Sequence, residues 1–154
     1  MSQFRLLFET QNKLQKVVNN MSLKWDDSLL TGIENIDSQH KELFKCLDKF
    51  LSAMREGKGK EEIESSLNFL EEYVIKHFND EEEIQRKYGY PKIKEQISQH
   101  EYFKNELKHL RVSFDKTGES VILALNVQNK ITDWVKNHIS KLDKDLGEYI
   151  KNKK

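Results

Sequence analysis

The sequence has few residues that interrupt or crosslink a chain. Pro91 is the only proline and there are six glycines among 154 residues, so long segments are free to be helical. The single cysteine, Cys46, excludes an intramolecular disulfide. No apolar run approaches the roughly 20 residues that span a bilayer. The composition therefore predicts an all-α fold, in a chain long enough for one domain with its own core.

The sequence also lacks an excess of charge of either sign. Lys and Arg total 26, as do Asp and Glu, so the net charge at neutral pH is zero although charged residues make up 34% of the chain. Without a net field, we expect neither nucleic acid nor a membrane surface as a partner. Leu6, Leu7 and Phe8 are followed by polar residues and are too short for the apolar part of a secretory signal. We therefore expect a cytoplasmic protein.

Apolar residues recur at helical spacing in four long segments. The segments run over about 37–56, 60–87, 93–116 and 120–149. Asp37 is a plausible N-cap of the first segment, and the turn Tyr88-Gly89-Tyr90-Pro91 separates the second from the third. Because short connections make consecutive helices antiparallel neighbours, we predict an up-down-up-down four-helix bundle.

Two further segments precede the bundle. Residues 2 to about 18 carry apolar side chains at roughly helical spacing and predict a short amphipathic helix. We assign it to an accessory segment, 1–20, outside the main domain, 21–154. This helix is either a partly ordered appendage or a docking segment for a protein partner or a second copy. Residues 22–36 lack a helical period and predict an extended N-terminal arm that lies on the bundle.

An imidazole and a carboxylate interrupt the apolar stripe of the second segment. His77 and Glu81 are four residues apart, so they share one helix face, and they continue the apolar series of Leu67, Leu70 and Val74. A carboxylate in a core is costly unless it is paired or bound to a metal. A metal ion is the simplest cation for Glu81.

Every predicted long helix contributes at least one inward ionisable group. They are His40, His77, Glu81, His100, His138 and Asp143. In an antiparallel bundle, the positions of the four histidines along their helices place all four imidazoles toward one end. Mixed imidazole and carboxylate ligands suit iron, zinc or manganese. Six donors are too many for one tetrahedral zinc, but two metals about 3.5–4 Å apart, bridged by Glu81 and Asp143, would use them.

The spacing of His138 and Asp143 makes a demand on the last helix. Residues five apart point about 140° away from each other on an ideal α-helix. Both side chains can serve one site only through a local π-type turn or by approaching it from two sides.

Five motifs between Leu23 and Tyr149 resemble the haemerythrin family, specifically its bacterial haemerythrin-like members. They are Gly32-x-x-x-Ile36-Asp37-x-Gln39-His40, His77-Phe78-x-x-Glu81, Gly89-Tyr90-Pro91, His100-x-x-Phe103 and Trp134-x-x-x-His138-Ile139-x-x-x-Asp143. The resemblance implies a non-haem di-iron centre, with Glu81 and Asp143 bridging the irons, that binds dioxygen reversibly for carriage, storage or sensing. It also implies His40 and His77 on the iron open to dioxygen, and His100 and His138 on the other.

The sequence departs from the family at Gln96. The second iron of the family normally has a third histidine, four residues before the one that His100 matches, and Gln96 stands there. Gln96 could ligate weakly through its amide oxygen, hydrogen-bond a water ligand, or leave the coordination position open. We expect a binding protein and not an enzyme, with oxidase- or peroxidase-like di-iron chemistry as the alternative.

Other polar and aromatic residues are assigned ordinary roles. We predict that Cys46 is a buried small apolar residue, that Trp25 and Trp134 are core aromatics, and that Asp80, Glu82 and Glu83 form a solvated face around Glu81.

The sequence has one Glu-x-x-His motif, at Glu106 and His109, whereas ferritin-like di-iron proteins need two. His109 is therefore expected to be an ordinary packed or exposed histidine.

Removing the metal should leave Glu81 and Asp143 without a cation, raise their pKa values and loosen the bundle.

Overall fold

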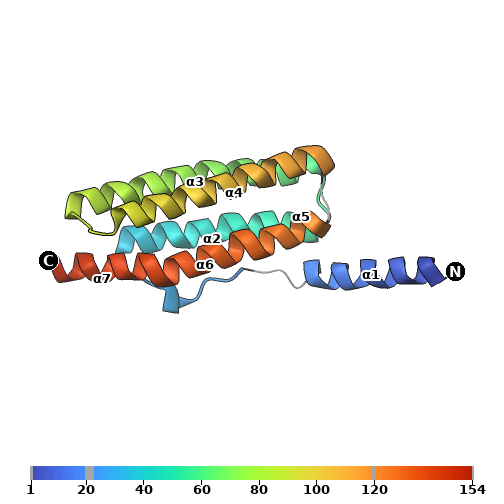
Figure 1. The fold of residues 1–154 in the computed structure, drawn as a ribbon, viewed down its shortest axis with the longest axis horizontal. Coiled ribbons are helices and arrows are strands. Elements are labelled where there is room, and N and C mark those ends of the chain that lie inside the picture. Colours follow the sequence, from blue (N-terminus) through green and yellow to red (C-terminus); the bar gives the residue numbers. More distant parts are fainter. Residues whose placement is uncertain (1, 20–22, 119–120, 154) are drawn as a thin grey trace.

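A computed structural model describes residues 2–19, 23–118 and 121–153, and over these ranges the chain is helical with no β-strand. Three long helices, α2 (Glu34–Arg55), α3 (Lys60–Tyr88) and α4 (Ile93–Thr117), are followed by a fourth helical run. This run comprises α5 (Val121–Asn126), η2 (Val127–Thr132), α6 (Asp133–His138), η3 (Ile139–Asp143) and α7 (Lys144–Lys153). These three helices and the fourth run, called the four rods below, lie antiparallel to their neighbours (Figure 1), which confirms the predicted bundle. The predicted start of the last helix at residue 120 lies outside the described residues.

The first bundle helix begins earlier than predicted, and the assignment of Asp37 as its N-cap was wrong. Helix α2 starts at Glu34, so Asp37 lies inside its first turn. The buried Asp37 carboxylate accepts hydrogen bonds from the Thr31 backbone N–H at 2.7 Å, the Thr31 hydroxyl at 2.8 Å and the Gly32 N–H at 3.0 Å. Asp37 therefore fixes the preceding loop to the helix instead of capping the helix itself.

The link between α3 and α4 is short and confirms the predicted turn. Helix α3 ends at Tyr88 and is capped by Gly89, which has a left-handed backbone (φ 63°), and the Tyr90 N–H bonds back to the Gln85 carbonyl at 2.9 Å. A left-handed glycine with this bond stops a helix, and Pro91 cannot continue it. The two helices are thereby held as an antiparallel hairpin.

The fourth rod contains two π-helical stretches, η2 and η3. The second, η3, covers Ile139–Asp143, so it begins directly after His138 and ends at Asp143. A π-turn hydrogen-bonds residues five apart and so brings them to the same side of the helix. Of the two arrangements expected for His138 and Asp143, the π-type turn is the one that forms.

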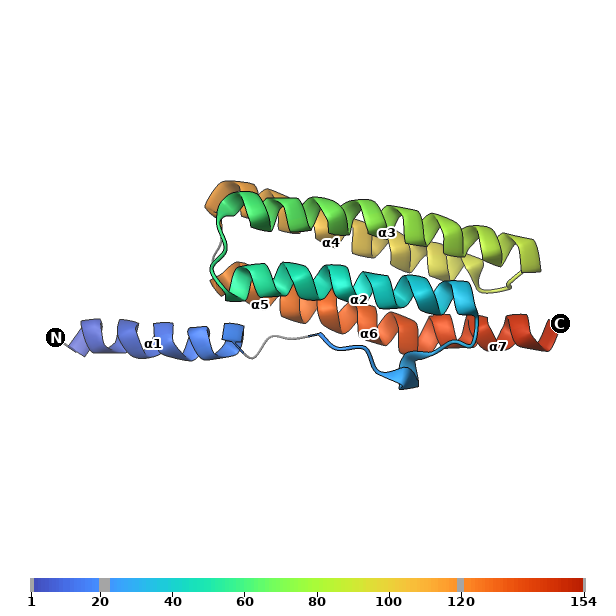
Figure 2. The same ribbon diagram turned by 180° about the vertical axis from the view of Figure 1, so that it is seen from behind.

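The N-terminal segments lie outside the four rods. Helix α1 (Ser2–Asn19) extends beyond one end of the bundle (Figure 1) and contacts α5 and α2. Four large apolar residues of α1 are exposed: Phe4, Leu6, Leu7 and Phe8. The arm contains a 3-10 turn, η1 (Asp27–Leu29), and crosses to the start of α2 (Figure 2). Leu23 and Leu29 are buried, so the arm lies on the bundle as predicted, although it is not extended throughout.

Two apolar clusters fill the interior. The larger contains Val74, Phe78 and most other core residues, whereas the smaller is built from Ile36, Tyr90, Leu146 and Ile150. On α2, α3 and the fourth rod the predicted ionisable residues fall between members of the two clusters, and on α4 His100 lies between Tyr90, just before the helix, and Phe103. The fold therefore encloses one polar layer between two apolar ones.

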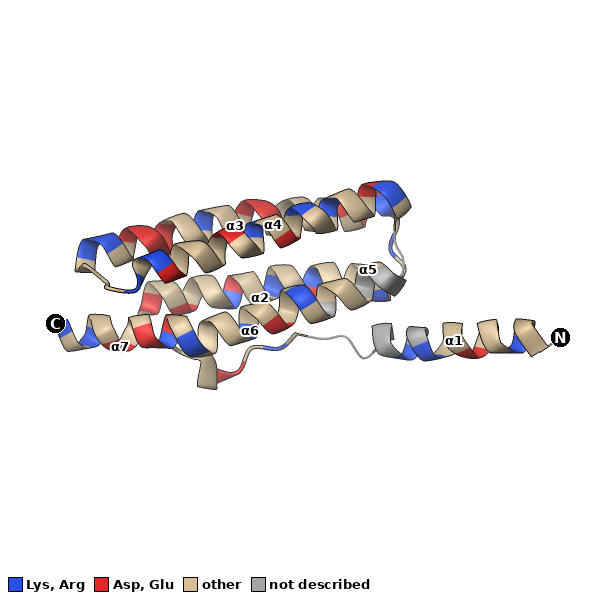
Figure 3. Ribbon diagram, in the orientation of Figure 1, with Lys and Arg blue, Asp and Glu red and all other residues tan. Residues whose placement is uncertain are grey.

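The outer surface carries both signs of charge. Lys and Arg interleave with Asp and Glu along the bundle helices (Figure 3). None of the described helices is long and apolar enough to cross a membrane.

A close contact at Gly147 holds the arm against α7. A Cβ atom at Gly147 would lie 2.3 Å from the Thr31 carbonyl oxygen, whereas one at Gly59 would meet nothing within 4 Å. We expect Gly147→Ala to destabilise the folded protein by about 1–3 kcal/mol, because the arm must move away and Thr31 also bonds to Asp37. Urea denaturation measures the change. Gly59→Ala is the matched control. Equal free energies of unfolding for the two variants would show that the approach of Thr31 to Gly147 does not contribute to stability.

Candidate metal centre

All six predicted ionisable residues meet in the polar layer. His40, His77, Glu81, His100, His138 and Asp143 are each 4% exposed or less. They come from α2, α3, α4, α6 and η3, and every imidazole lies at the same end of the bundle, as predicted. The ligand atoms of His40, His77, Glu81 and Asp143 lie within 4.8 Å of one another, and so do those of Glu81, His100 and His138.

The first group joins His40 and His77 to one oxygen of each carboxylate. Glu81 Oε2 lies 3.4 Å from His40 Nε2 and 3.3 Å from His77 Nε2. Asp143 Oδ2 lies 3.0 Å from His40 Nε2. Four potential ligand atoms therefore surround one point.

The second group joins His100 and His138 to the other oxygen of each carboxylate. Glu81 Oε1 lies 3.2 Å from His100 Nε2 and 4.0 Å from His138 Nε2, and Asp143 Oδ1 lies 3.2 Å from His138 Nε2. The two imidazole nitrogens are 3.2 Å apart. Each carboxylate thus presents one oxygen to each histidine pair.

The buried nitrogen and oxygen atoms of the two groups are arranged as they would be around a pair of cations. His40 Nε2, both Glu81 oxygens and Asp143 Oδ2 are buried and close, yet none makes a hydrogen bond of good geometry. Buried polar atoms are normally satisfied, so close, unaligned lone pairs suggest a shared ion between them. Imidazole nitrogen with carboxylate oxygen is a donor set that iron, zinc and manganese accept. The residues present therefore fit two metal ions.

Three side chains hold the outer nitrogens of the histidines. His77 Nδ1 lies 2.8 Å from Gln39 Oε1, His100 Nδ1 is 2.8 Å from Glu82 Oε2, and His138 Nδ1 is 2.8 Å from Gln99 Oε1. Since these oxygens accept, each Nδ1–H donates, and each Nε2 is turned toward the cluster. Such contacts fix the ring and its tautomer in metal sites.

Sequence reasoning missed these three residues. The prediction that Glu82 belongs to a solvated face was wrong, because it is 8% exposed and bonded to His100. Gln39 and Gln99 each directly precede a histidine, but each bonds to a histidine of a neighbouring helix. The repeated Gln-His pair was the available signal, and only the packing of the helices gives it meaning.

Without metal, the imidazoles supply the cations of the site. Burial lowers the pKa of His40 and His138, but the Asp143 and Glu81 carboxylates outweigh it and raise these pKa values to about 9 and about 10. Burial raises the pKa of Glu81, but contacts with four imidazoles hold it well below its usual range. Burial and the Glu81 charge raise the pKa of Asp143, but His138 and His40 outweigh them, so this pKa is also lowered. In the metal-free chain, both carboxylate pKa values therefore lie below their ordinary range, because the imidazoles supply positive charge. The rise expected on removing a metal stays a prediction.

Gln96 is completely buried beside the second group. Its Nε2 donates to Asp143 Oδ1 at 2.9 Å, and its Oε1 has no hydrogen-bond partner. Gln96 was predicted to be a weak ligand, to hydrogen-bond a water ligand, or to leave the coordination position open. In the structure it contacts the Asp143 oxygen that faces His138.

Aromatic rings pack against the second group. Phe78 stacks on His100 with centroids 3.9 Å apart, and Trp134 stacks on His138 at 4.5 Å. Trp134 and Trp25 are partly buried against the core, as is Cys46, which is half-buried and not fully buried as predicted. The stacked rings restrict solvent around the imidazoles.

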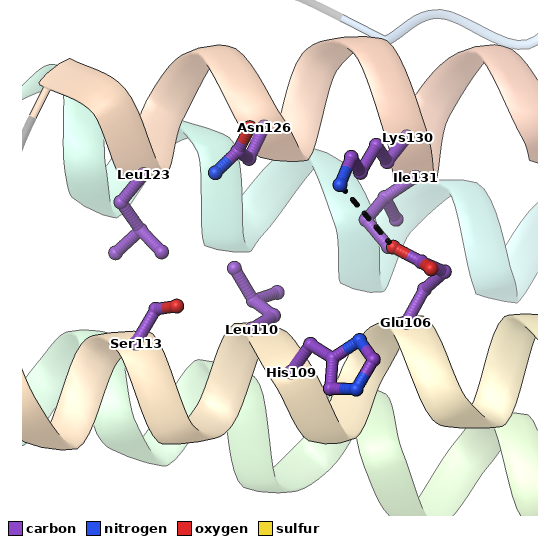
Figure 4. Close-up of a pocket in the computed structure, with 8 residues that line it drawn as sticks. All are labelled: Glu106, His109, Leu110, Ser113, Leu123, Asn126, Lys130 and Ile131. Atoms are coloured by element: carbon purple, nitrogen blue, oxygen red, sulfur yellow. Dashed lines mark ion pairs between the residues drawn. The ribbon is translucent and has the colours of Figure 1, made fainter.

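The Glu106–His109 motif lies away from the cluster. Both residues line a small hollow between α4 and the fourth rod, where Glu106 pairs with Lys130 at 4.0 Å (Figure 4). His109 is exposed, as predicted for a histidine without a role in the site.

Comparisons with known proteins agree with this geometry. Residues 31–150 match the family model described as the Hemerythrin HHE cation binding domain. The chain is 31% identical over 130 residues to Bacteriohemerythrin of Pseudomonas paraeruginosa, covering 84% of this chain and 82% of that protein. It is 30% identical over 117 residues to Bacteriohemerythrin of Methylococcus capsulatus (76% and 87%), and 29% identical over 119 residues to Myohemerythrin of Riftia pachyptila (77% and 86%). The chain therefore belongs to the haemerythrin family, whose members are di-iron proteins of the oxygen-binding type.

Proposed function

We propose that the chain holds two non-haem iron ions, bridged by Glu81 and Asp143, and binds dioxygen reversibly without turning it over. The observation that supports this most directly is the division of the two carboxylates, since each presents one oxygen to each histidine pair. His40 and His77 would hold one iron, and His100 and His138 the other. Iron in this setting supplies the electrons and open coordination that dioxygen binding requires.

The remaining residues would orient the ligands and exclude water. Gln39, Glu82 and Gln99 fix three imidazoles through their Nδ1–H groups. Phe78, with 1% exposure, and the apolar clusters on both sides keep the polar layer dry. A water-poor site favours release of dioxygen unchanged, because protons that would drive its reduction are scarce.

Anaerobic reconstitution tests the proposal. The apoprotein is loaded with ferrous iron, metal per chain is counted, and the visible spectrum is followed as dioxygen is admitted and then removed. Two irons and a charge-transfer band that appears and disappears with dioxygen are expected. Irreversible oxidation, or retention of a single iron, would refute reversible binding.

Gln96 supports one alternative, an oxidase- or peroxidase-like di-iron activity. An amide that donates to Asp143 does not supply the imidazole of a fully ligated second iron. Steady turnover of hydrogen peroxide with a reducing co-substrate, abolished by Gln96→His, would favour the alternative over dioxygen carriage.

The contact between Gln99 and His138 predicts a change in metal affinity. We expect Gln99→Leu to weaken binding of iron by about 10–100-fold, because His138 loses the acceptor that fixes its ring. Competition with a chelator measures the change. Gln99→Glu keeps an acceptor oxygen and should retain most of the affinity; an equal loss in both variants would mean that the acceptor is not what matters.

We also propose that residues 1–20 form an accessory segment that contacts a protein partner or a second copy of the chain. Phe4 is 81% exposed and Leu7 69% exposed on α1, which suits a helix that docks elsewhere. Deleting residues 1–20 should leave the iron content unchanged and abolish any self-association seen by light scattering. A loss of iron on deletion would place the segment within the metal-binding domain.

A further inference from the structure

Two buried glutamines lie at the edge of the metal centre with unused hydrogen-bonding atoms. Gln85 and Gln96 are both 0% exposed. Both polar atoms of the Gln85 side chain and Oε1 of Gln96 have no hydrogen-bond partner. Buried amides are normally satisfied, so their unused atoms indicate a missing polar partner of small size.

The register of the helical hairpin places both glutamines one turn from the level at which Glu81 faces His100. Glu81 on α3 faces His100 on α4, with Oε1 and Nε2 3.2 Å apart. Gln85 lies one turn after Glu81 and Gln96 one turn before His100, so both fall at the same level of the hairpin. Gln96 also contacts Asp143 Oδ1, the oxygen that lies 3.2 Å from His138 Nε2.

The hydrogen bond to Asp143 sets the direction of the Gln96 amide. Its Nε2 faces the carboxylate, because the reversed amide would bring two acceptor oxygens together. Gln96 Oε1 is therefore turned away from Asp143 and is not a bridging or chelating partner of that carboxylate. It remains an acceptor for a proton carried by some other small ligand.

Resting on the di-iron function proposed above, we propose that the metal held by His100 and His138 keeps an exchangeable coordination position that faces Gln85 and Gln96. Four atoms of the protein would hold this metal: His100 Nε2, His138 Nε2, Glu81 Oε1 and Asp143 Oδ1. Iron with imidazole and carboxylate ligands accepts further small ligands at its remaining positions. The position would hold water at rest and accept a small monovalent anion in its place.

The amides make this position chemically different from the one beside His40 and His77. Gln85 Nε2 can donate to a bound anion, and the two amide oxygens can accept from bound water. Among the described residues, the buried side-chain amide atoms without a partner all belong to Gln85 and Gln96. In the part of the chain that the structure describes, a metal held by His100 and His138 would therefore be the one with unpartnered buried amides beside it.

Azide, a small anion with strong charge-transfer absorption on ferric iron, tests the inference by equilibrium titration. The iron content of the oxidised holoprotein is measured first, and bound azide is then counted by equilibrium dialysis and visible absorbance. We expect two azide ions per iron pair in the wild-type chain and one in Gln96→His, where an imidazole takes the position. Gln85→Leu should keep its iron and the first azide but weaken the second by about tenfold, through loss of a hydrogen bond.

The control is Asn105→His, which adds an imidazole at an exposed position of α4, the helix that carries Gln96. This variant should still bind two azide ions per iron pair. A wild-type chain with two irons that binds a single azide overturns the inference but not the di-iron function. Two azide ions on Gln96→His also overturn it. Fewer than two irons per chain refutes the proposed function, and the inference with it, before any azide is added.

Discussion

Replacing Glu81 with glutamine is expected to cost the chain both metal ions, whereas replacing His77 with glutamine costs one. Glu81 is 1% exposed, and its two oxygens face different histidine pairs. The amide keeps the size of the side chain but loses the charge, and its NH2 group points a donor at one pair. His77 belongs only to the first group, so the cluster of Glu81, His100 and His138 stays complete when His77 is lost.

Metal analysis after loading and desalting measures both changes. We expect Glu81→Gln to retain less than about a tenth of the wild-type iron, since loss of a direct ligand removes more than the 10–100-fold expected for an outer contact. Glu83→Gln, two residues further along α3 and exposed, is the matched control and should keep its iron. If Glu81→Gln and His77→Gln lost the same single iron, the carboxylate would serve only one metal.

The polar layer was predictable because periodicity alone identifies it. His77 and Glu81 occupy positions that the spacing of apolar residues reserves for the core, and a buried carboxylate demands a cation. The five-residue step from His138 to Asp143 likewise left only two arrangements, a π-type turn or an approach from two sides, since an α-helix cannot bring both side chains to one site. The structure contains the π-turn. Patterns within single helices were therefore sufficient to predict which ionisable residues meet in the polar layer.

Contacts between helices were not predictable in the same way. Glu82 follows Glu81 in a run of acidic residues, and its burial depends on where α4 places His100. The position of Asp37 as a tie to Thr31 depends on the course of the arm. The lowered pKa of Glu81 in the metal-free chain has the same origin, because the effect of four imidazoles on Glu81 requires their distances, not their positions in the chain.

The metal-free protein is expected to be most stable between about pH 5 and 6.5 and to lose stability as the pH rises toward 10. The folded pKa values of His40 and His138, about 9 and about 10, lie above the ordinary value of 6.5. Protonated imidazoles therefore stabilise the fold fully below pH 6.5, and this contribution disappears as the pH passes through the folded values. The pKa of Glu81 is lowered, so its contribution is present above its ordinary value of 4.5 and disappears in acid.

Urea denaturation of the metal-free chain at pH 6 and pH 9.5 measures this effect. The shift at His40 alone corresponds to about 3 kcal/mol of unfolding free energy. His40→Gln cannot gain this proton, so its stability should change less over the same interval. The metal-loaded protein should also change little, because an imidazole that binds metal through Nε2 has no proton there to lose. A metal-free stability that stays constant or rises from pH 6 to 9.5 would show that metal-free histidines do not replace the metal charge.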